Sequence, residues 1–148
     1  YTTLFRSAQV PEERRQRVHF LPHGSSARAR GLMRTADYGL VSLEPGVIDF
    51  AYPSKTATYL SEGLPVLAGV EPDSALVRQV TDWGVGRHLP VESAACCREA
   101  LISLVSSGED RESARRRAHA VWQREFDQES RLREWDRVLE SVGASHDE

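Results

Sequence analysis

Ser54 and Lys55 are the residues whose types and positions most directly indicate chemistry. They follow Pro53, which can begin a helix, and the Ser54 hydroxyl is a natural N-cap for the unpaired N–H groups of a first turn. A helix start carries partial positive charge, and the Lys55 ammonium adds a full charge beside it. The pattern predicts an anion site, with a plain helix cap and a solvated lysine as the alternative.

The segments around this pair predict a loop, a short helix and a buried strand. The helix is expected over Thr56–Glu62, and Gly63 can take the left-handed conformation that ends a helix. Pro65–Ala68 is a short apolar run, which is typical of a strand covered on both faces.

The rest of the chain alternates strands and helices in the same way. We expect strands at Val18–Pro22, Tyr38–Leu43 and Arg87–Pro90. We expect helices over Ala27–Thr35 (capped by Ser25 or Ser26, with Leu32 and Met33 inward), from Asp73 or Ser74 to Trp83, over Glu92–Ser106, over Arg111–Arg124 and after Asp127. This order predicts an α/β fold with a parallel sheet, built from right-handed βαβ units, in which Tyr38–Leu43 is buried.

The predicted topology places several loops at one edge of the sheet. In open parallel sheets, ligands bind beyond the carboxyl ends of the strands. The Gly24 turn, the Glu44–Tyr52 loop and the helix start at Ser54 are therefore expected to line one crevice. Gly46 would let the backbone come close to a ligand there.

An ordered series of motifs carries a family resemblance. The series is Ala36-Asp-Tyr-Gly-Leu-Val-Ser-Leu43, Pro45-Gly-Val-Ile-Asp-Phe50, Pro53-Ser-Lys55 and Tyr59-Leu-Ser-Glu-Gly-Leu-Pro-Val66. It resembles the donor-binding, C-terminal half of retaining glycosyltransferases with two Rossmann-like domains (the GT-B type), closest to the branch that builds bacterial surface polysaccharides. The resemblance implies a partial Rossmann-like domain over residues 8–108 and C-terminal helices over 109–148.

The resemblance also implies roles for particular residues. The donor is expected to be a UDP-sugar or a similar nucleotide-sugar, with no further cofactor and no metal. Its diphosphate would lie at Ser54 and Lys55, with its ribose or sugar near Gly46, Phe50 and Thr58 and its base near Leu21, Pro22 and His23. The catalytic residues are not assigned, and a sugar or lipid-linked sugar acceptor would bind a missing N-terminal domain.

This chain departs from the family pattern at two positions. Many relatives carry two glutamates eight residues apart, where this sequence has Phe50 and Thr58. Thr58 would bond a ribose hydroxyl as a neutral partner, so the preference for sugar and nucleotide stays open.

The first seven residues, Tyr1–Ser7, resemble a translated sequencing-adapter end and not a native segment. We therefore expect a chain truncated at its N-terminus. The parent protein would be a transferase, and this part alone would be inactive.

The C-terminal part has its own pattern. Arg115, Arg116 and Arg117 point in different directions around a helix and are expected to be solvated. An apolar stripe at helical spacing is expected to pack on the core of the domain or, by the resemblance, on the missing domain: Leu132, Trp135, Val138, Leu139 and Val142.

Composition excludes several classes of function. A net charge of −3 gives no general case for nucleic acid, and no apolar run approaches the ~20 residues of a membrane span. The five histidines lack metal-ligand spacing, and adjacent Cys96 and Cys97 form no disulfide framework. A reduced, cytoplasmic setting fits best, with a peripheral place at the inner membrane face as one option.

Two other functions remain compatible with this sequence. One is a nucleotide-sugar 2-epimerase of the same two-domain architecture. The other is a non-enzymatic doubly wound module, such as a phosphoacceptor receiver, although this chain lacks the acidic cluster and the Lys-Pro pair of such modules.

Overall fold

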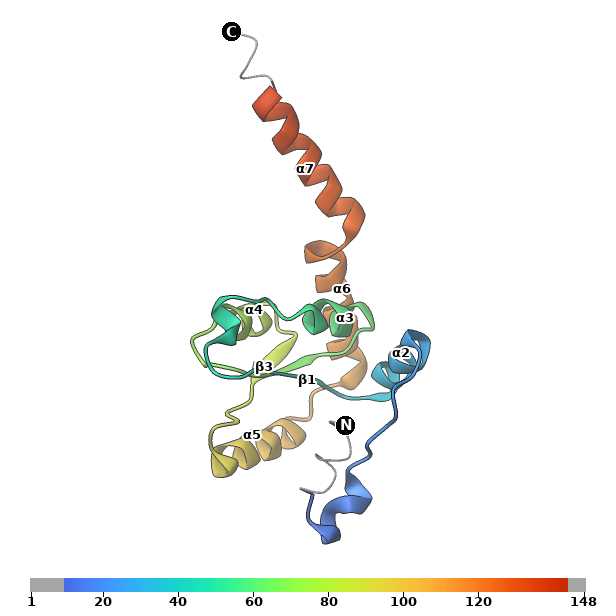
Figure 1. Ribbon diagram of the computed structural model, residues 1–148, viewed down its shortest axis with the longest axis vertical. Helices are drawn as coiled ribbons and strands as arrows, with labels where there is room; N and C mark the ends of the chain where they lie inside the picture. Colours follow the sequence, from blue (N-terminus) through green and yellow to red (C-terminus); the bar gives the residue numbers. More distant parts are fainter. Residues whose placement is uncertain (1–9, 144–148) are drawn as a thin grey trace. The chain divides into compact units, whose positions relative to one another are not determined.

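The computed structural model describes residues 10–143, apart from the side chains of Ser130 and Val142. The prediction for residues 1–7 therefore lies outside the described residues. The chain divides into two compact units, residues 1–31 and 32–148. Figure 1 shows the order of the helices and strands along the chain.

The first unit contains no strand among its described residues. It holds the 3-10 helix η1 (Glu12–Arg17) and the start of α2 (Ser26–Thr35). The Arg28 N–H donates to the Ser25 hydroxyl at 3.3 Å, so Ser25 is the residue that caps α2.

The predicted strand at Val18–Pro22 is wrong. Its backbone joins no sheet, and its side chains are exposed. An apolar run becomes a strand only where another strand pairs with it, and the run itself does not encode that partner. The inward placement of Leu32 is also wrong, because α2 buries none of its residues.

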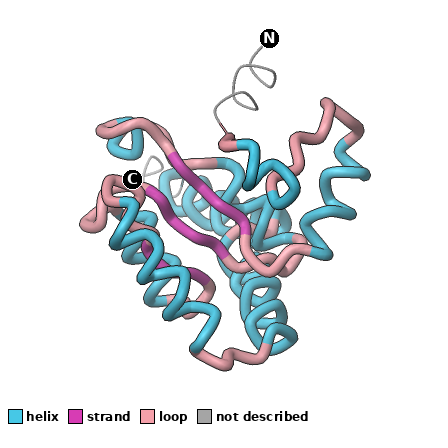
Figure 2. The backbone as a smooth tube through the Cα atoms, turned by 90° about the horizontal axis from the view of Figure 1, so that it is seen from below, coloured by secondary structure: helices cyan, strands magenta, loops and turns pink. Residues whose placement is uncertain are grey.

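The second unit is built on a parallel sheet of three strands in the order β1-β2-β3. They are β1 (Gly39–Ser42), β2 (Val66–Gly69) and β3 (Gly86–His88). The helices α3 (Ser54–Ser61) and α4 (Ala75–Asp82) connect them in turn. Figure 2 shows the strands in magenta with helices in cyan beside them. The predicted α/β fold with a parallel sheet and flanking helices is confirmed at this level.

The core lies on the face of the sheet that α3 and α4 cover (Figure 1). Val66 and Ala68 of β2 pack there with Leu60 of α3 and with Leu76 and Val80 of α4. The helix α6 (Arg111–Glu125) completes this cluster with Ala118 and Val121. Burial of this apolar surface is the main source of stability for the unit.

The opposite face of the sheet is only partly covered. The helix α5 (Ala94–Ser106) lies there, and its Leu101 and Leu104 line a small hollow with Leu67 and Arg87 of β2 and β3. The side chain of Leu40 in β1 is 49% exposed, so the predicted burial of this strand holds for one of its faces and is wrong for the other. Leu40 stays exposed because α5 lies beneath the other two strands, β2 and β3.

Tyr59 of α3 covers the outer edge of β1. The Gly39 N–H bonds to Pro65 on the β2 side, so the alternation of the ladder places the Leu40 carbonyl on the outer edge. The Tyr59 hydroxyl donates to that carbonyl at 3.3 Å. A Cβ atom at Gly39 would lie 2.5 Å from the Tyr59 ring, so only glycine fits beneath it. The free edge is therefore less available to other strands than an open one.

Arginines of α6 tie the ends of other elements together. Arg115 donates to the Ala36 carbonyl at 3.0 Å and to the Glu62 carbonyl at 2.8 Å. Arg117 donates to the Gly84 carbonyl at 3.2 Å. The prediction that all three arginines are solvated is thus wrong for Arg115, which is partly buried. It holds for Arg116, whose partners are surface side chains, and for Arg117, which is exposed although it bonds to Gly84.

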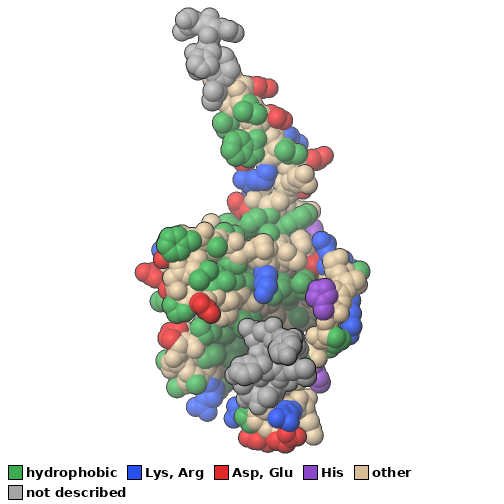
Figure 3. Space-filling view, viewed as in Figure 1, with side chains coloured by type: hydrophobic (Ala, Val, Ile, Leu, Met, Phe, Trp, Pro, Cys, Tyr) green, Lys and Arg blue, Asp and Glu red, His purple; other side chains and the backbone are tan. Residues whose placement is uncertain are grey.

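The helix α7 (Gln128–Gly143) presents its apolar stripe to solvent. Trp135 and Leu139 are each 64% exposed, and Leu132 and Val138 are exposed as well. Figure 3 shows hydrophobic side chains, in green, at the surface of this helix. The prediction that this stripe packs on the core of the domain is wrong, and the side chain of Val142 lies outside the described residues. The stability of a helix of this length is marginal without tertiary contacts. The exposed apolar residues of α7 therefore add little to the stability of the fold.

We expect Arg115→Gln to lower the free energy of unfolding by about 1–3 kcal/mol, because two carbonyls lose charge-assisted hydrogen bonds. Urea unfolding followed by circular dichroism measures this change. Arg116→Gln is the matched control on the same helix, and it should cost under about 1 kcal/mol because its ion pairs lie at the surface. Equal losses in the two variants would contradict the role given to Arg115.

Candidate functional site

Two helices begin at the carboxyl edge of the sheet. β1 ends at Ser42 and leads through a loop with the 3-10 turn η2 (Val47–Asp49) into α3. β2 ends at Gly69 and leads through a short turn into α4. Ser74 caps α4, since its hydroxyl accepts the Val77 N–H at 3.3 Å, as predicted.

The start of α3 differs from the prediction in one respect. The helix begins at Ser54 itself, the N-cap is Pro53, and no side chain caps this end. Ser54 as N-cap is therefore wrong. A serine acts as a cap from the position before the first helical residue, where its hydroxyl can reach the N–H groups of the first turn.

The uncapped start of α3 leaves backbone N–H groups without a partner inside the helix. The Thr56 N–H bonds to the Pro53 carbonyl at 2.9 Å. The N–H groups of Ser54 and Lys55 donate to no group in the part of the chain that the structure describes, and both residues are exposed. Thr56 and Leu60 anchor the opposite side of the helix in the core. The first turn of α3 thus presents two backbone donors and an ammonium group to solvent.

A carboxylate joins the two loops at this edge. Glu71, in the turn after β2, accepts the Gly46 N–H at 2.5 Å. Gly46 has a φ of 78°, a left-handed conformation that glycine adopts without strain. The bond to Gly46, and then the backbone N–H of Glu71 itself, hold the pKa of this carboxyl below its usual value because they stabilise the charged form.

The bond between Gly46 and Glu71 was not predicted from the sequence. The available signal was the position of Glu71, two residues after the end of β2, at the edge where ligands bind in parallel sheets. The Gly46 N–H is therefore not free to bind a ligand, because it already donates to the Glu71 carboxylate.

The remaining predicted site residues lie in three places. The Thr58 hydroxyl donates to the Ser54 carbonyl at 3.2 Å, within α3. Phe50 lies in the loop before α3 and is 92% exposed. Leu21, Pro22 and His23 lie in the first unit, where their backbone forms neither helix nor strand and their side chains are exposed.

The arrangement suits an anion, with one constraint. Helix donors and the Lys55 ammonium attract negative charge at the start of α3. The Glu71 carboxylate repels it from Gly46. In the described residues, no cluster of acidic, histidine or cysteine side chains is placed to hold a metal ion. The helices described here include none with the length and apolar character to cross a membrane.

Comparison with protein-family models, with curated proteins and with solved structures finds no match. The glycosyltransferase resemblance therefore stays a prediction from the motifs.

Glu71 should make the stability of the protein depend on pH in the acid range. Its pKa is lowered from 4.5 in the folded state, so its contribution is present above that value and is lost as the pH falls through the folded pKa. We expect Glu71→Gln to reduce the loss of stability below about pH 4.5. Urea midpoints measured from pH 7 to pH 3 test this expectation.

Asp73→Asn is the control for this experiment. The Asp73 carboxylate is exposed and accepts no hydrogen bond within the described range of the chain. Its removal should leave the acid part of the profile unchanged. A profile that Glu71→Gln does not alter would contradict the role given to the Glu71 charge in the acid range.

Proposed function

We propose that this chain is the donor-binding part of a retaining glycosyltransferase and that its donor is a nucleotide-sugar, namely a UDP-sugar. The observation that carries the proposal is the open start of α3, where the Ser54 and Lys55 N–H groups and the Lys55 ammonium lie at the carboxyl edge of a parallel sheet. A Rossmann-like domain binds the phosphates of a nucleotide at such an edge.

The chemistry of the transfer fits these groups. As the glycosidic bond breaks, the departing diphosphate gains negative charge, and fixed N–H donors stabilise such charge without reorganising. The diphosphate would bind at Ser54 and Lys55, away from the anionic Glu71. The free lone pairs of the Glu71 carboxylate suit hydroxyl donors, which the ribose and the sugar supply.

The proposal assigns the other half of the reaction to a part of the parent protein outside this chain. That part would bind the sugar or lipid-linked sugar acceptor. The transfer would take place in the cytoplasm and would serve the synthesis of a surface polysaccharide. This chain by itself would bind the donor without transferring it.

Calorimetric titration of UDP, with uridine in parallel, tests the proposal. We expect UDP to bind saturably and uridine more weakly, because uridine lacks the diphosphate. Lys55→Ala should weaken UDP binding by roughly threefold to tenfold, since an exposed charged donor contributes about 1 kcal/mol. Arg133→Ala, an exposed cation on α7, is the matched control and should leave binding unchanged.

Two substitutions at Ser54 separate its N–H from its hydroxyl. Ser54→Pro removes the N–H at the first helical position, where proline is tolerated, and should weaken UDP binding. Ser54→Ala keeps the N–H and should bind as the natural sequence does, because the hydroxyl caps nothing. Failure of the folded chain to bind UDP, or UDP binding that neither Lys55→Ala nor Ser54→Pro weakens, would refute the assignment to the start of α3.

A further inference from the structure

A cavity opens at the amino edge of the sheet, opposite the edge where α3 and α4 begin. Its volume is about 420 Å³, within the range of small-molecule sites. Its walls include Tyr38, Pro65 and Gly86, which stand at the amino ends of β1, β2 and β3. The cavity is therefore separate from the start of α3 and does not depend on the proposed function.

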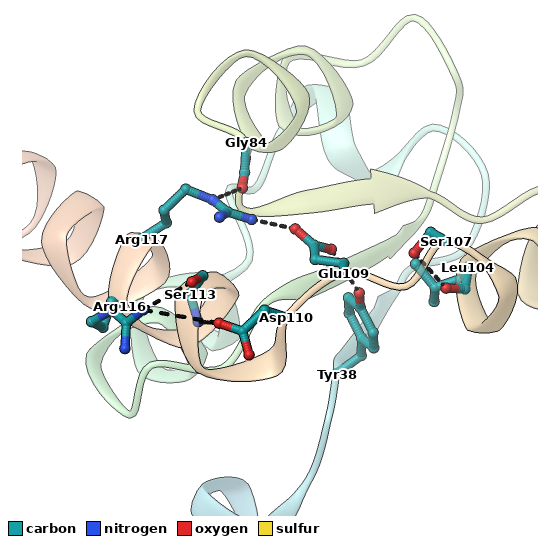
Figure 4. Close-up of polar contacts among 9 residues, drawn as sticks. All are labelled: Tyr38, Gly84, Leu104, Ser107, Glu109, Asp110, Ser113, Arg116 and Arg117. Carbon is teal, nitrogen blue, oxygen red and sulfur yellow. Dashed lines mark hydrogen bonds and ion pairs between the residues drawn. The ribbon is translucent and has the colours of Figure 1, made fainter.

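The polar wall of this cavity is held in a fixed arrangement, which Figure 4 shows. Arg117 donates through Nε to the Gly84 carbonyl at 3.2 Å and through Nη2 to the Glu109 carboxylate. The other carboxylate oxygen of Glu109 accepts the Tyr38 hydroxyl at 3.3 Å. Two partners thus orient the guanidinium of Arg117, and the charge of Glu109 is already offset.

Donors remain open on the same wall. Nη1 of Arg117 makes no hydrogen bond to the described residues. Arg87 of β3 lines the cavity, and its guanidinium makes no hydrogen bond or ion pair within the described chain. Arg117 balances Glu109, so the positive charge of Arg87 has no counterpart there.

The Tyr38 hydroxyl stays protonated under neutral conditions. Desolvation by burial and the nearby Glu109 carboxylate raise the pKa of this tyrosine, while Arg87 lowers it by a smaller amount. The wall therefore presents guanidinium donors and no free anionic acceptor.

We propose that this cavity binds a small organic anion, whose phosphate or carboxylate group lies between Arg87 and Nη1 of Arg117. Guanidinium groups are well matched to both kinds of oxyanion because their planar donors pair with two oxygens at once. Apolar side chains of Pro65, Val85 and Ala114 line the rest of the cavity and offer contact to the body of the ligand.

Nuclear magnetic resonance titration of the whole chain tests this proposal. Inorganic phosphate and acetate are added separately at constant ionic strength, with chloride as the balancing ion. We expect saturable shifts of the backbone amides from Gly84 to Arg87 with at least one anion, and the stronger of the two identifies the preferred head group. Arg87→Gln should weaken that binding about tenfold, because it removes a charged donor.

Arg98→Gln is the control. Arg98 is an exposed arginine on α5 and does not line this cavity. Its substitution should leave the affinity unchanged, and the amide spectrum reports whether each variant is folded. The proposal is overturned if neither anion gives saturable shifts, if Arg87→Gln leaves them as they are, or if Arg98→Gln weakens them equally.

Discussion

The pairing of β2 with both of its neighbours is the constraint on which the rest of the second unit depends. The backbones approach so closely that a Cβ atom at Gly86 would lie 2.3 Å from the Val66 carbonyl oxygen. Parallel neighbours need a crossover connection, which here contains a helix each time, and this brings the starts of α3 and α4 to a single edge. The open donors at Ser54 and Lys55 are thus a result of topology as much as of residue type.

The two edges of this sheet differ in how their polar groups are used. At the amino edge, guanidinium groups of α6 bond to the carbonyls of Ala36, Glu62 and Gly84, which end three other segments. At the carboxyl edge, the loops are joined by the Gly46–Glu71 bond, and the first turn of α3 keeps free donors. At the amino edge, side chains of α6 bond to the ends of the other elements, whereas at the carboxyl edge the contacts are between loops.

Local signals in the sequence predicted the parts of the structure that have local causes. Gly63 follows the end of α3 in the left-handed conformation, with a φ of 65°, and Ser74 caps α4. These outcomes follow from the steric freedom of glycine and from the reach of a serine hydroxyl. The parallel sheet followed from the alternation of such segments.

The wrong predictions concern contacts with distant parts of the chain. Whether Leu40 or Trp135 is buried depends on what covers it, and an apolar pattern does not say whether a cover exists. Arg115 bonds to carbonyls 79 and 53 residues away, and no spacing rule connects them. For the candidate site, Ser54 and Lys55 could be located from the sequence, but the bond between Gly46 and Glu71 could not, because it joins two separate loops.

The contact between Gly39 and Tyr59 has a consequence for the evolution of this fold. The ring of Tyr59 occupies the space that a side chain at position 39 would need. The two positions therefore cannot vary independently. A lineage that gains a side chain at position 39 must first accept a smaller residue at position 59, and the outer edge of β1 would then lose its cover. Paired substitution of this kind leaves a covariation signal between residues that are 20 positions apart in the sequence.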